Sequence, residues 1–176
     1  IIFIFFVMAT IHSSQVRSQA PQVQLEDHIQ EHWTPKEVQN ATIVINFIQQ
    51  LMNAHDFEFI ESAFGTHPYH QHNRSMKDGI PGVLEAVRDL VKSFPDYCYD
   101  VKRILVSGDH VVFHSHVTVK SKHRGNDKKG FIISDTWRLE KGKIVEHWDA
   151  IQPLNGFFRF YTWLTGGKIR NSNGLF

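Results

Sequence analysis

Histidine and aspartate side chains recur on the last three predicted strands, at a spacing that suits proton transfer. His114 and His116 are two residues apart, as are His147 and Asp149, and Asp135 lies between these two pairs. Residues two apart in a strand point to the same face of a sheet. If the three strands are neighbours, these imidazole and carboxylate groups would meet in one hollow and could act there as general acid and base.

The same residue types allow other interpretations. A hydrogen-bonded network in the core, or histidines that face solvent, would need no chemistry. The pair His114-x-His116 could also supply metal ligands, with His72 or His147 and Asp149 to complete the set. We expect no metal and no cofactor, because this spacing is loose and thiolate ligands are missing. The sequence also contains no Gly-x-Ser-x-Gly elbow, phosphate loop or dinucleotide fingerprint.

The first half of the chain carries helix signals. Thr34 and Glu37 form a capping box with Pro35 in the first turn, and apolar residues then recur at helical spacing. The predicted elements are helices over residues 34–53, 56–64 and 83–94, with a short strand over residues 69–73.

The second half changes to the period of two that is typical of strands. The predicted strands cover residues 99–106, 111–120, 131–139 and 144–152, with a tight turn at Lys141-Gly142. The aromatic stretch 157–164 is expected to form a short helix over one end of the sheet, or a dimer contact. Helices first and an antiparallel sheet last predict an α+β fold with the helices packed on one curved sheet face.

The chain opens on an almost unbroken apolar run, Ile1–Ile11, followed by Ser18-Gln19-Ala20. This pattern predicts a signal peptide over residues 1–20 with cleavage after Ala20, then a flexible arm over residues 21–33 and one domain over residues 34–176. A buried N-terminal strand or a retained membrane anchor are the alternatives. We expect a secreted or periplasmic protein that leaves the membrane on cleavage, and a net charge of +1 gives no reason to expect a nucleic-acid partner.

Several stretches together resemble one protein family. They are Tyr-His-Gln-His-Asn at 69–73, Gly-Asp-His-Val-Val-Phe-His-Ser-His at 108–116, and the segment 135–149 that runs from Asp-Thr-Trp-Arg to His-Trp-Asp, with Asn-Ser-Asn-Gly-Leu-Phe at 171–176. In this order they resemble the SnoaL-like branch of the nuclear transport factor two-like superfamily over residues 34–176. The resemblance implies a cystatin-like α+β barrel, in which a cone-shaped curved sheet wraps around N-terminal helices and holds a pocket in its mouth.

The resemblance also implies which residues act. Polyketide cyclases of this type close rings by aldol condensation with an aspartate as acid and base, and Asp149 is the nearest match. The implied catalytic residues are Asp149, His147, Asp135 and His116. The implied ligand-binding residues are His72, Asn73, His114, Gln71 and Trp137, with packing as the alternative for Trp137.

We therefore expect an enzyme, free of cofactors, that performs acid–base chemistry on a small carbonyl-containing molecule. Cyclisation, isomerisation and dehydration all fit. A secreted protein that binds a small ligand without catalysis is one alternative, and a metal-dependent enzyme with a histidine cluster is another. Because cones of this kind often pair through the open sheet face, the resemblance also implies a homodimer.

Overall fold

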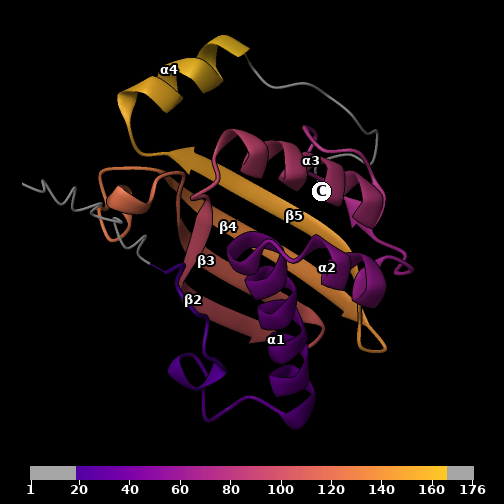
Figure 1. The fold of residues 1–176 in the computed structure, drawn as a ribbon. Coiled ribbons are helices and arrows are strands. Elements are labelled where there is room, and N and C mark those ends of the chain that lie inside the picture. The colour runs from indigo at the N-terminus through magenta and orange to yellow at the C-terminus, as the bar shows by residue number, and fades with distance from the viewer. Residues whose placement is uncertain (1–18, 166–176) are drawn as a thin grey trace, which may run out of the picture.

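A curved, unclosed sheet with helices on its concave side makes up the described chain, residues 19–165 of this computed structural model (Figure 1). The strands are β1 His70–Gln71, β2 Cys98–Ser107, β3 His110–Thr118, β4 Phe131–Glu140 and β5 Lys143–Pro153. The helical elements are η1 Leu25–Asp27, α1 Pro35–Ile48, η2 Gln49–Ala54, α2 Phe57–Phe64, α3 Gly79–Ser93, η3 Ser121–His123 and α4 Gly156–Thr165. The predicted α+β class is confirmed.

The described strands are ordered β1-β5-β4-β3-β2 in the sheet. β2 to β5 pair antiparallel along the chain, as predicted, whereas the short β1 joins the far edge in parallel with β5. The predicted tight turn between β4 and β5 has positive φ angles at Lys141 (50°) and Gly142 (75°), which suits a two-residue hairpin. This arrangement places β1 directly beside the strand that carries His147 and Asp149.

The capping box at the start of α1 forms as predicted and also ties the helix to the sheet. The backbone N–H of Glu37 donates to Thr34 Oγ1 at 3.3 Å, and the backbone N–H of Thr34 donates to Glu37 Oε2 at 2.9 Å. Glu37 Oε1 accepts the backbone N–H of Gly108, in the turn between β2 and β3, at 2.8 Å. The hydrogen bonds from the backbone N–H groups of Thr34 and Gly108 lower the pKa of Glu37 to about 2.

The core lies between the sheet and the first helices (Figure 1). α1 and the π-helical turn η2 that continues it bury Val44, Phe47, Ile48 and Leu51. Fully burying one such side chain contributes roughly 1.5–3 kcal/mol to folding. The helix therefore forms the inner wall, which lies against β2 and β3.

Helix α3 begins earlier than the sequence predicts, at Gly79. Pro81 lies in the first turn, where its missing N–H needs no partner. A Cβ atom at Gly82 would lie 2.3 Å from the backbone oxygen of Lys77, so glycine here permits the close approach of the preceding loop.

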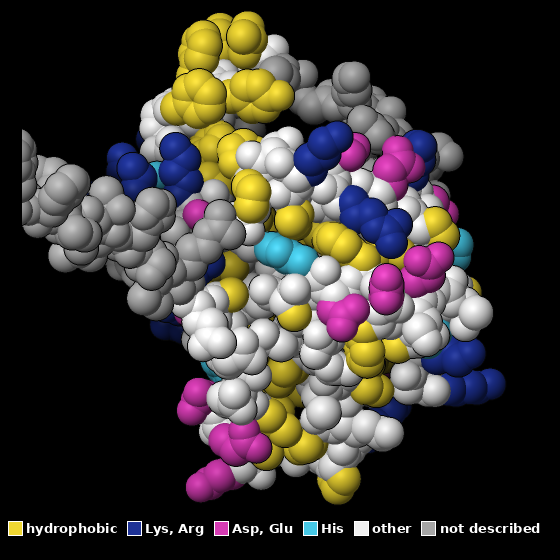
Figure 2. Space-filling view, in the orientation of Figure 1, with side chains coloured by type: hydrophobic (Ala, Val, Ile, Leu, Met, Phe, Trp, Pro, Cys, Tyr) yellow, Lys and Arg dark blue, Asp and Glu magenta, His cyan; other side chains and the backbone are white. Residues whose placement is uncertain are grey.

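The predicted C-terminal helix is present as α4, and one of its aromatic side chains packs on the sheet. Phe158 packs on Phe131 of β4 with ring centroids 4.6 Å apart. The large side chains left open, each 54–77% exposed, are Phe157, Phe160, Tyr161, Trp163 and Leu164. Figure 2 shows hydrophobic side chains gathered over this end of the molecule.

The segment before α1 lies against η2. The backbone N–H of Val23 donates to Gln49 Oε1 at 3.1 Å, and Asn53 Nδ2 donates to the carbonyl oxygen of Pro21 at 2.9 Å. Most of the predicted signal peptide (1–18) and the motif 171–176 lie outside the described residues. Within the described residues, no helix combines the length and hydropathy needed to cross a bilayer.

Candidate active site

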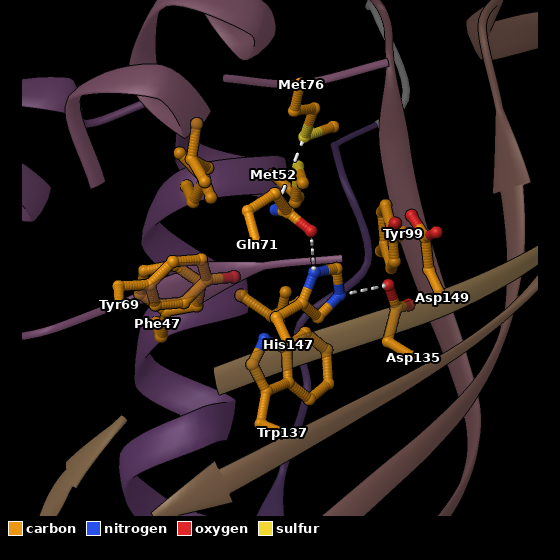
Figure 3. Close-up of a pocket in the computed structure, with 13 residues that line it drawn as sticks. Phe47, Met52, Tyr69, Gln71, Met76, Tyr99, Asp135, Trp137, His147 and Asp149 are labelled. Atoms are coloured by element: carbon orange, nitrogen blue, oxygen red, sulfur yellow. Dashed lines mark hydrogen bonds and ion pairs between the residues drawn. The ribbon is translucent and has the colours of Figure 1, made fainter. Parts of the chain in front are cut away.

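Three titratable side chains from β4 and β5 meet on the concave face of the sheet (Figure 3). Asp135 lies directly opposite Asp149 in the β4–β5 register, and Trp137 lies opposite His147, so these side chains share one face. Ligand-type atoms of Asp135, His147 and Asp149 all lie within 4.8 Å of one another. The structure thus brings together three of the four predicted catalytic residues.

His147 uses both ring nitrogens within the protein. Nδ1 lies 2.9 Å from Gln71 Oε1 on β1, and Nε2 lies 3.1 Å from Asp135 Oδ1 on β4 (Figure 3). The ring stacks with Trp137 and Tyr69 at centroid distances of 5.1 and 6.2 Å, and the residue is only 6% exposed. The imidazole is therefore held in position by hydrogen bonds and ring contacts.

Asp135 is a carboxyl group in an apolar setting, 2% exposed. Burial raises the pKa of Asp135, and the hydrogen bond and charge of His147 lower it in part. The nearby negative charge of Asp149 raises it further. Tyr99 lies beside the carboxyl group (Figure 3), and a hydrogen bond with its side chain also lowers the pKa of Asp135 in part.

Asp149 has a different environment, set by Asn73. Asn73 Oδ1 accepts the backbone N–H of Ser75 at 2.9 Å, which fixes the orientation of the amide group. Its Nδ2 therefore faces outward as a donor, and it bonds Asp149 Oδ2 at 2.5 Å. Asn73, predicted to position a ligand, thus positions the carboxylate.

Asp149 lies at the junction between a wide hollow and a small recess. The hollow has a volume of about 540 Å³, within the range of small-molecule sites, and apolar side chains from α3, β4 and α4 line most of it. A recess beside Asp135 and His147 has only about 20 Å³, room for about one water molecule. The two spaces share the side chains Met52, Met76, Tyr99 and Asp149.

Two tyrosines on the floor of the hollow were not predicted as site residues. Tyr97 and Tyr99 line it, and their rings meet edge to face at 6.0 Å. Burial raises the pKa of both hydroxyl groups, so both stay protonated and can donate hydrogen bonds. The period of two around β2 places them on one face, but the sequence does not show that this face is the one that Asp135 shares.

His114 and His116 point away from this site, which corrects their predicted placement. Phe113 lies opposite Asp135 in the β3–β4 register, so the histidines on either side of Ser115 project from the other face of the sheet. His114 is exposed, and its Nδ1 lies 3.3 Å from Ser134 Oγ on β4. His116 Nε2 lies 2.7 Å from the backbone oxygen of Lys129. Neither histidine lines the hollow. The register between β3 and β4 decides which face of the sheet each side chain occupies, and the sequence does not reveal that register.

His72 also lies outside the hollow, so its predicted role as a ligand-positioning group is corrected. Its Nε2 lies 2.9 Å from Glu146 Oε1, and its ring stacks on Trp148 at 4.8 Å. Arg138 binds the other oxygen of Glu146 at 2.7 Å. Burial acts to raise the pKa of Glu146, but the bonds from Arg138 and His72 outweigh it and the pKa is lowered.

The remaining predicted ligand-binding residues, Gln71 and Trp137, line the inner recess. Gln71 contacts His147 through its side-chain oxygen, and Trp137 is 1% exposed. Both residues therefore shape the recess around His147.

A metal ion would fit the spacing of Asp135, His147 and Asp149. The geometry of the side chains is that of hydrogen bonds, however, since His147 Nε2 faces Asp135 Oδ1 and Asp149 faces an amide donor. The alternative ligand set based on His114 and His116 is not assembled, because those side chains lie on the opposite sheet face.

Comparison with known proteins agrees with this architecture. The family model of the SnoaL-like polyketide cyclase matches residues 42–156. A proposed polyketide cyclase from Bacillus cereus ATCC 10987 is 21% identical with a TM-score of 0.56, and the match covers 68% of this chain and 79% of that one. A proposed SnoaL-like polyketide cyclase from Jannaschia sp. CCS1 is 17% identical with a TM-score of 0.57, and the match covers 76% and 96%.

A third solved structure carries a different activity in its description. AclR, a proposed hydroxylase from Streptomyces galilaeus, is 18% identical with a TM-score of 0.54, and the match covers 71% of this chain and 86% of that one. No curated protein matches this chain in sequence. At these identities the solved structures show the shared fold alone, and they confirm the predicted cone-shaped architecture. The match of the family model over most of the described domain shows that the chain belongs to the SnoaL-like polyketide cyclase family.

Proposed function

We propose that this protein is a cofactor-free enzyme that moves a proton at a carbon atom beside the carbonyl group of a small organic molecule. Family membership supports the reaction class. The observation that carries the assignment is the position of Asp149, a carboxylate oriented by Asn73 at the inner end of the hollow. A positioned carboxylate in a mostly apolar site is a suitable general base.

In the proposed reaction Asp149 takes the proton from the carbon, and the electron pair of that C–H bond moves towards the carbonyl oxygen. Tyr97 and Tyr99 line the same hollow and, with raised pKa values, remain hydrogen-bond donors for the oxygen that becomes negative. Return of the proton from Asp149 to a second carbon gives isomerisation. Attack of the enolate on another carbonyl gives cyclisation, and loss of a hydroxyl group with the same proton gives water and a dehydrated product.

The lining indicates the type of molecule that is accepted. No lysine or arginine side chain of residues 19–165 lines the hollow or its recess, whereas Asp89, Asp135 and Asp149 do. An anionic ligand such as a carboxylate or phosphate would meet only like charges in an apolar setting, which is unfavourable. We therefore propose a neutral, mainly apolar substrate.

His147 takes a different part from the one predicted for it. Its ring nitrogens are both occupied by Gln71 and Asp135, so we assign the substrate-contacting role to Asp149 alone. His147 and Asp135 form a buried pair behind the reacting carbon.

Exchange of carbon-bound hydrogen for deuterium tests the proposal whichever product the full reaction gives. A panel of neutral ketones and diketones is incubated with the protein in D₂O, and deuterium uptake is followed by NMR. The wild type is expected to accelerate exchange for at least one compound, and Asp149→Asn to slow it by about 10²–10⁴-fold, the usual worth of a general base. Asp127→Asn, a change in an exposed loop, is the matched control and should leave the rate unchanged.

The outcome also separates catalysis from ligand binding alone. Saturable binding of these compounds with no exchange by the wild type would support the alternative of a non-catalytic binding protein, for which the apolar walls would suffice. Equal exchange rates for wild type and Asp149→Asn would remove Asp149 from its assigned role.

A further inference from the structure

The side-chain amide of Gln71 has an orientation that the surrounding backbone fixes. Its Oε1 accepts the backbone N–H of Asn73 at 2.8 Å. An N–H group can only donate, so the atom that faces it must be the oxygen and not the NH₂ group. The opposite assignment would set two donors against each other.

This orientation determines the protonation of His147. The same Oε1 lies 2.9 Å from His147 Nδ1, and an amide oxygen offers only lone pairs. His147 Nδ1 must therefore carry a hydrogen. The other ring nitrogen, Nε2, is then the only one that can gain or lose a proton, and it faces Asp135 Oδ1 at 3.1 Å.

We propose that Gln71 is a positioning residue that holds His147 in the Nδ1–H form, so that Asp135 and His147 share a single proton between Oδ1 and Nε2. The proton lies either on the carboxyl oxygen or on the imidazole, and in both arrangements the pair has no net charge. Without the proton, a lone pair of the ring would face a carboxylate inside a buried site, which is unfavourable.

The surroundings of the pair favour this neutral state. The titratable groups that face it are Asp149 on β5, Tyr97 and Tyr99 at β2, and Tyr69 before β1. η2 and α3 contribute only apolar side chains, Leu51, Met52 and Val83 among them. With the pair neutral, Asp149 is the single charged group among the described residues that line the recess, and two opposed carboxylates on β4 and β5 do not repel each other.

In the reaction proposed above, this arrangement leaves Asp149 as the base and keeps a proton in reserve behind it. Only that use depends on the proposed function, because the protonation of His147 is a property of the resting protein and needs no substrate.

Two-bond ¹⁵N–¹H correlation NMR of the imidazole rings tests the inference directly. Wild type at neutral pH is expected to show a protonated Nδ1 for His147. Gln71→Leu removes the acceptor, and the ring is expected to change to the form with a proton on Nε2 and none on Nδ1. Gln71→Glu keeps an acceptor oxygen and should retain the wild-type pattern.

Gln39→Leu, at a position on α1 away from the recess, is the matched control and should leave the His147 signals unchanged. An unprotonated Nδ1 in the wild type would overturn the inference, and that measurement needs no variant to fold. An unchanged pattern in a folded Gln71→Leu protein would also overturn the positioning role. If the wild-type and variant spectra are as expected but the protein exchanges no carbon-bound hydrogen, this inference stands and the proposed reaction is rejected.

Discussion

Asp135 and Asp149 lie directly opposite each other on β4 and β5, yet they occupy different environments. Asp135 is buried and bonds His147, whereas Asp149 lies at the open hollow and accepts a bond from Asn73. Neighbouring carboxyl groups in unlike surroundings can take unlike protonation states, which is how one site can hold both a proton and a base.

The pH dependence of stability should report the buried state of Asp135. Burial raises its pKa in the folded protein above the usual value for an aspartate, so the folded protein holds a proton that the unfolded chain releases. That contribution is present below the unfolded pKa and is lost as pH rises through the folded pKa. Asn cannot ionise, so the free energy of unfolding of Asp135→Asn relative to wild type should increase as the pH rises from about 4, the ordinary pKa of an aspartate, through the raised pKa of Asp135 in the folded protein.

Urea unfolding at intervals across this range measures the difference. Asp127→Asn, in an exposed loop, provides the control and should give a curve parallel to that of the wild type. If the Asp135→Asn curve also ran parallel, the raised pKa of Asp135 would be refuted.

Removal of the Asn73 side chain should harm catalysis more than stability. Asn73→Ala loses one bond to Asp149 and two to Ser75, from its backbone N–H and its hydroxyl, each worth about 1 kcal/mol. The freed carboxylate loses its orientation, so hydrogen exchange at the substrate carbon should fall by about tenfold or more. Circular dichroism melting together with the exchange assay checks both effects, and an unchanged exchange rate would deny Asn73 its role.

The outer-face histidines should not affect turnover. His114→Ala leaves an exposed position and should change neither activity nor stability. His116→Ala removes a bond to the Lys129 carbonyl and should destabilise the fold by about 1 kcal/mol with an unchanged exchange rate. A loss of activity in either variant, with the protein still folded, would contradict the placement of these histidines on the outer face.

The attachment of α4 should depend on Phe158. This side chain packs on Phe131 and lines the hollow, whereas its neighbour Phe157 is 70% exposed. Phe158→Ala should therefore weaken ligand binding and speed proteolytic cleavage near residues 156–165, because the helix loses its ring contact with Phe131. Phe157→Ala is the matched control, and equal cleavage rates for the two variants would show that Phe158 does not attach the helix.

Much of the fold could be predicted because its signals are local. The capping box at Thr34 and Glu37, the tight turn at Lys141-Gly142 and the period of two in the strands are each set by short-range chemistry. The start of α3 could not be placed, because the glycine at position 82 accommodates the backbone of Lys77 in the preceding loop and does not end or begin the helix.

The site could be predicted only in part, for a geometric reason. Alternation correctly paired His147 with Asp149, since both lie on one strand. It could not decide whether His116 shares a face with Asp135, because that depends on the register between β3 and β4. Gln71 was predicted as a ligand contact, and only the parallel pairing of β1 with β5 reveals its bond to His147.

Export and self-association remain predictions from the sequence. The first residue of the mature protein, determined by mass spectrometry, would test cleavage after Ala20. Sedimentation of the purified domain would test the expected homodimer.

The structure of a complex with a simple phenol tests the central claim most directly, because a phenol is a stable mimic of an enol. We expect the ring to lie in the hollow with its hydroxyl oxygen within about 3 Å of Asp149 or Tyr99, at hydrogen-bonding distance. A phenol bound elsewhere, or one whose hydroxyl points to solvent while Asp149 contacts only Asn73, would contradict the assignment of Asp149 as the base.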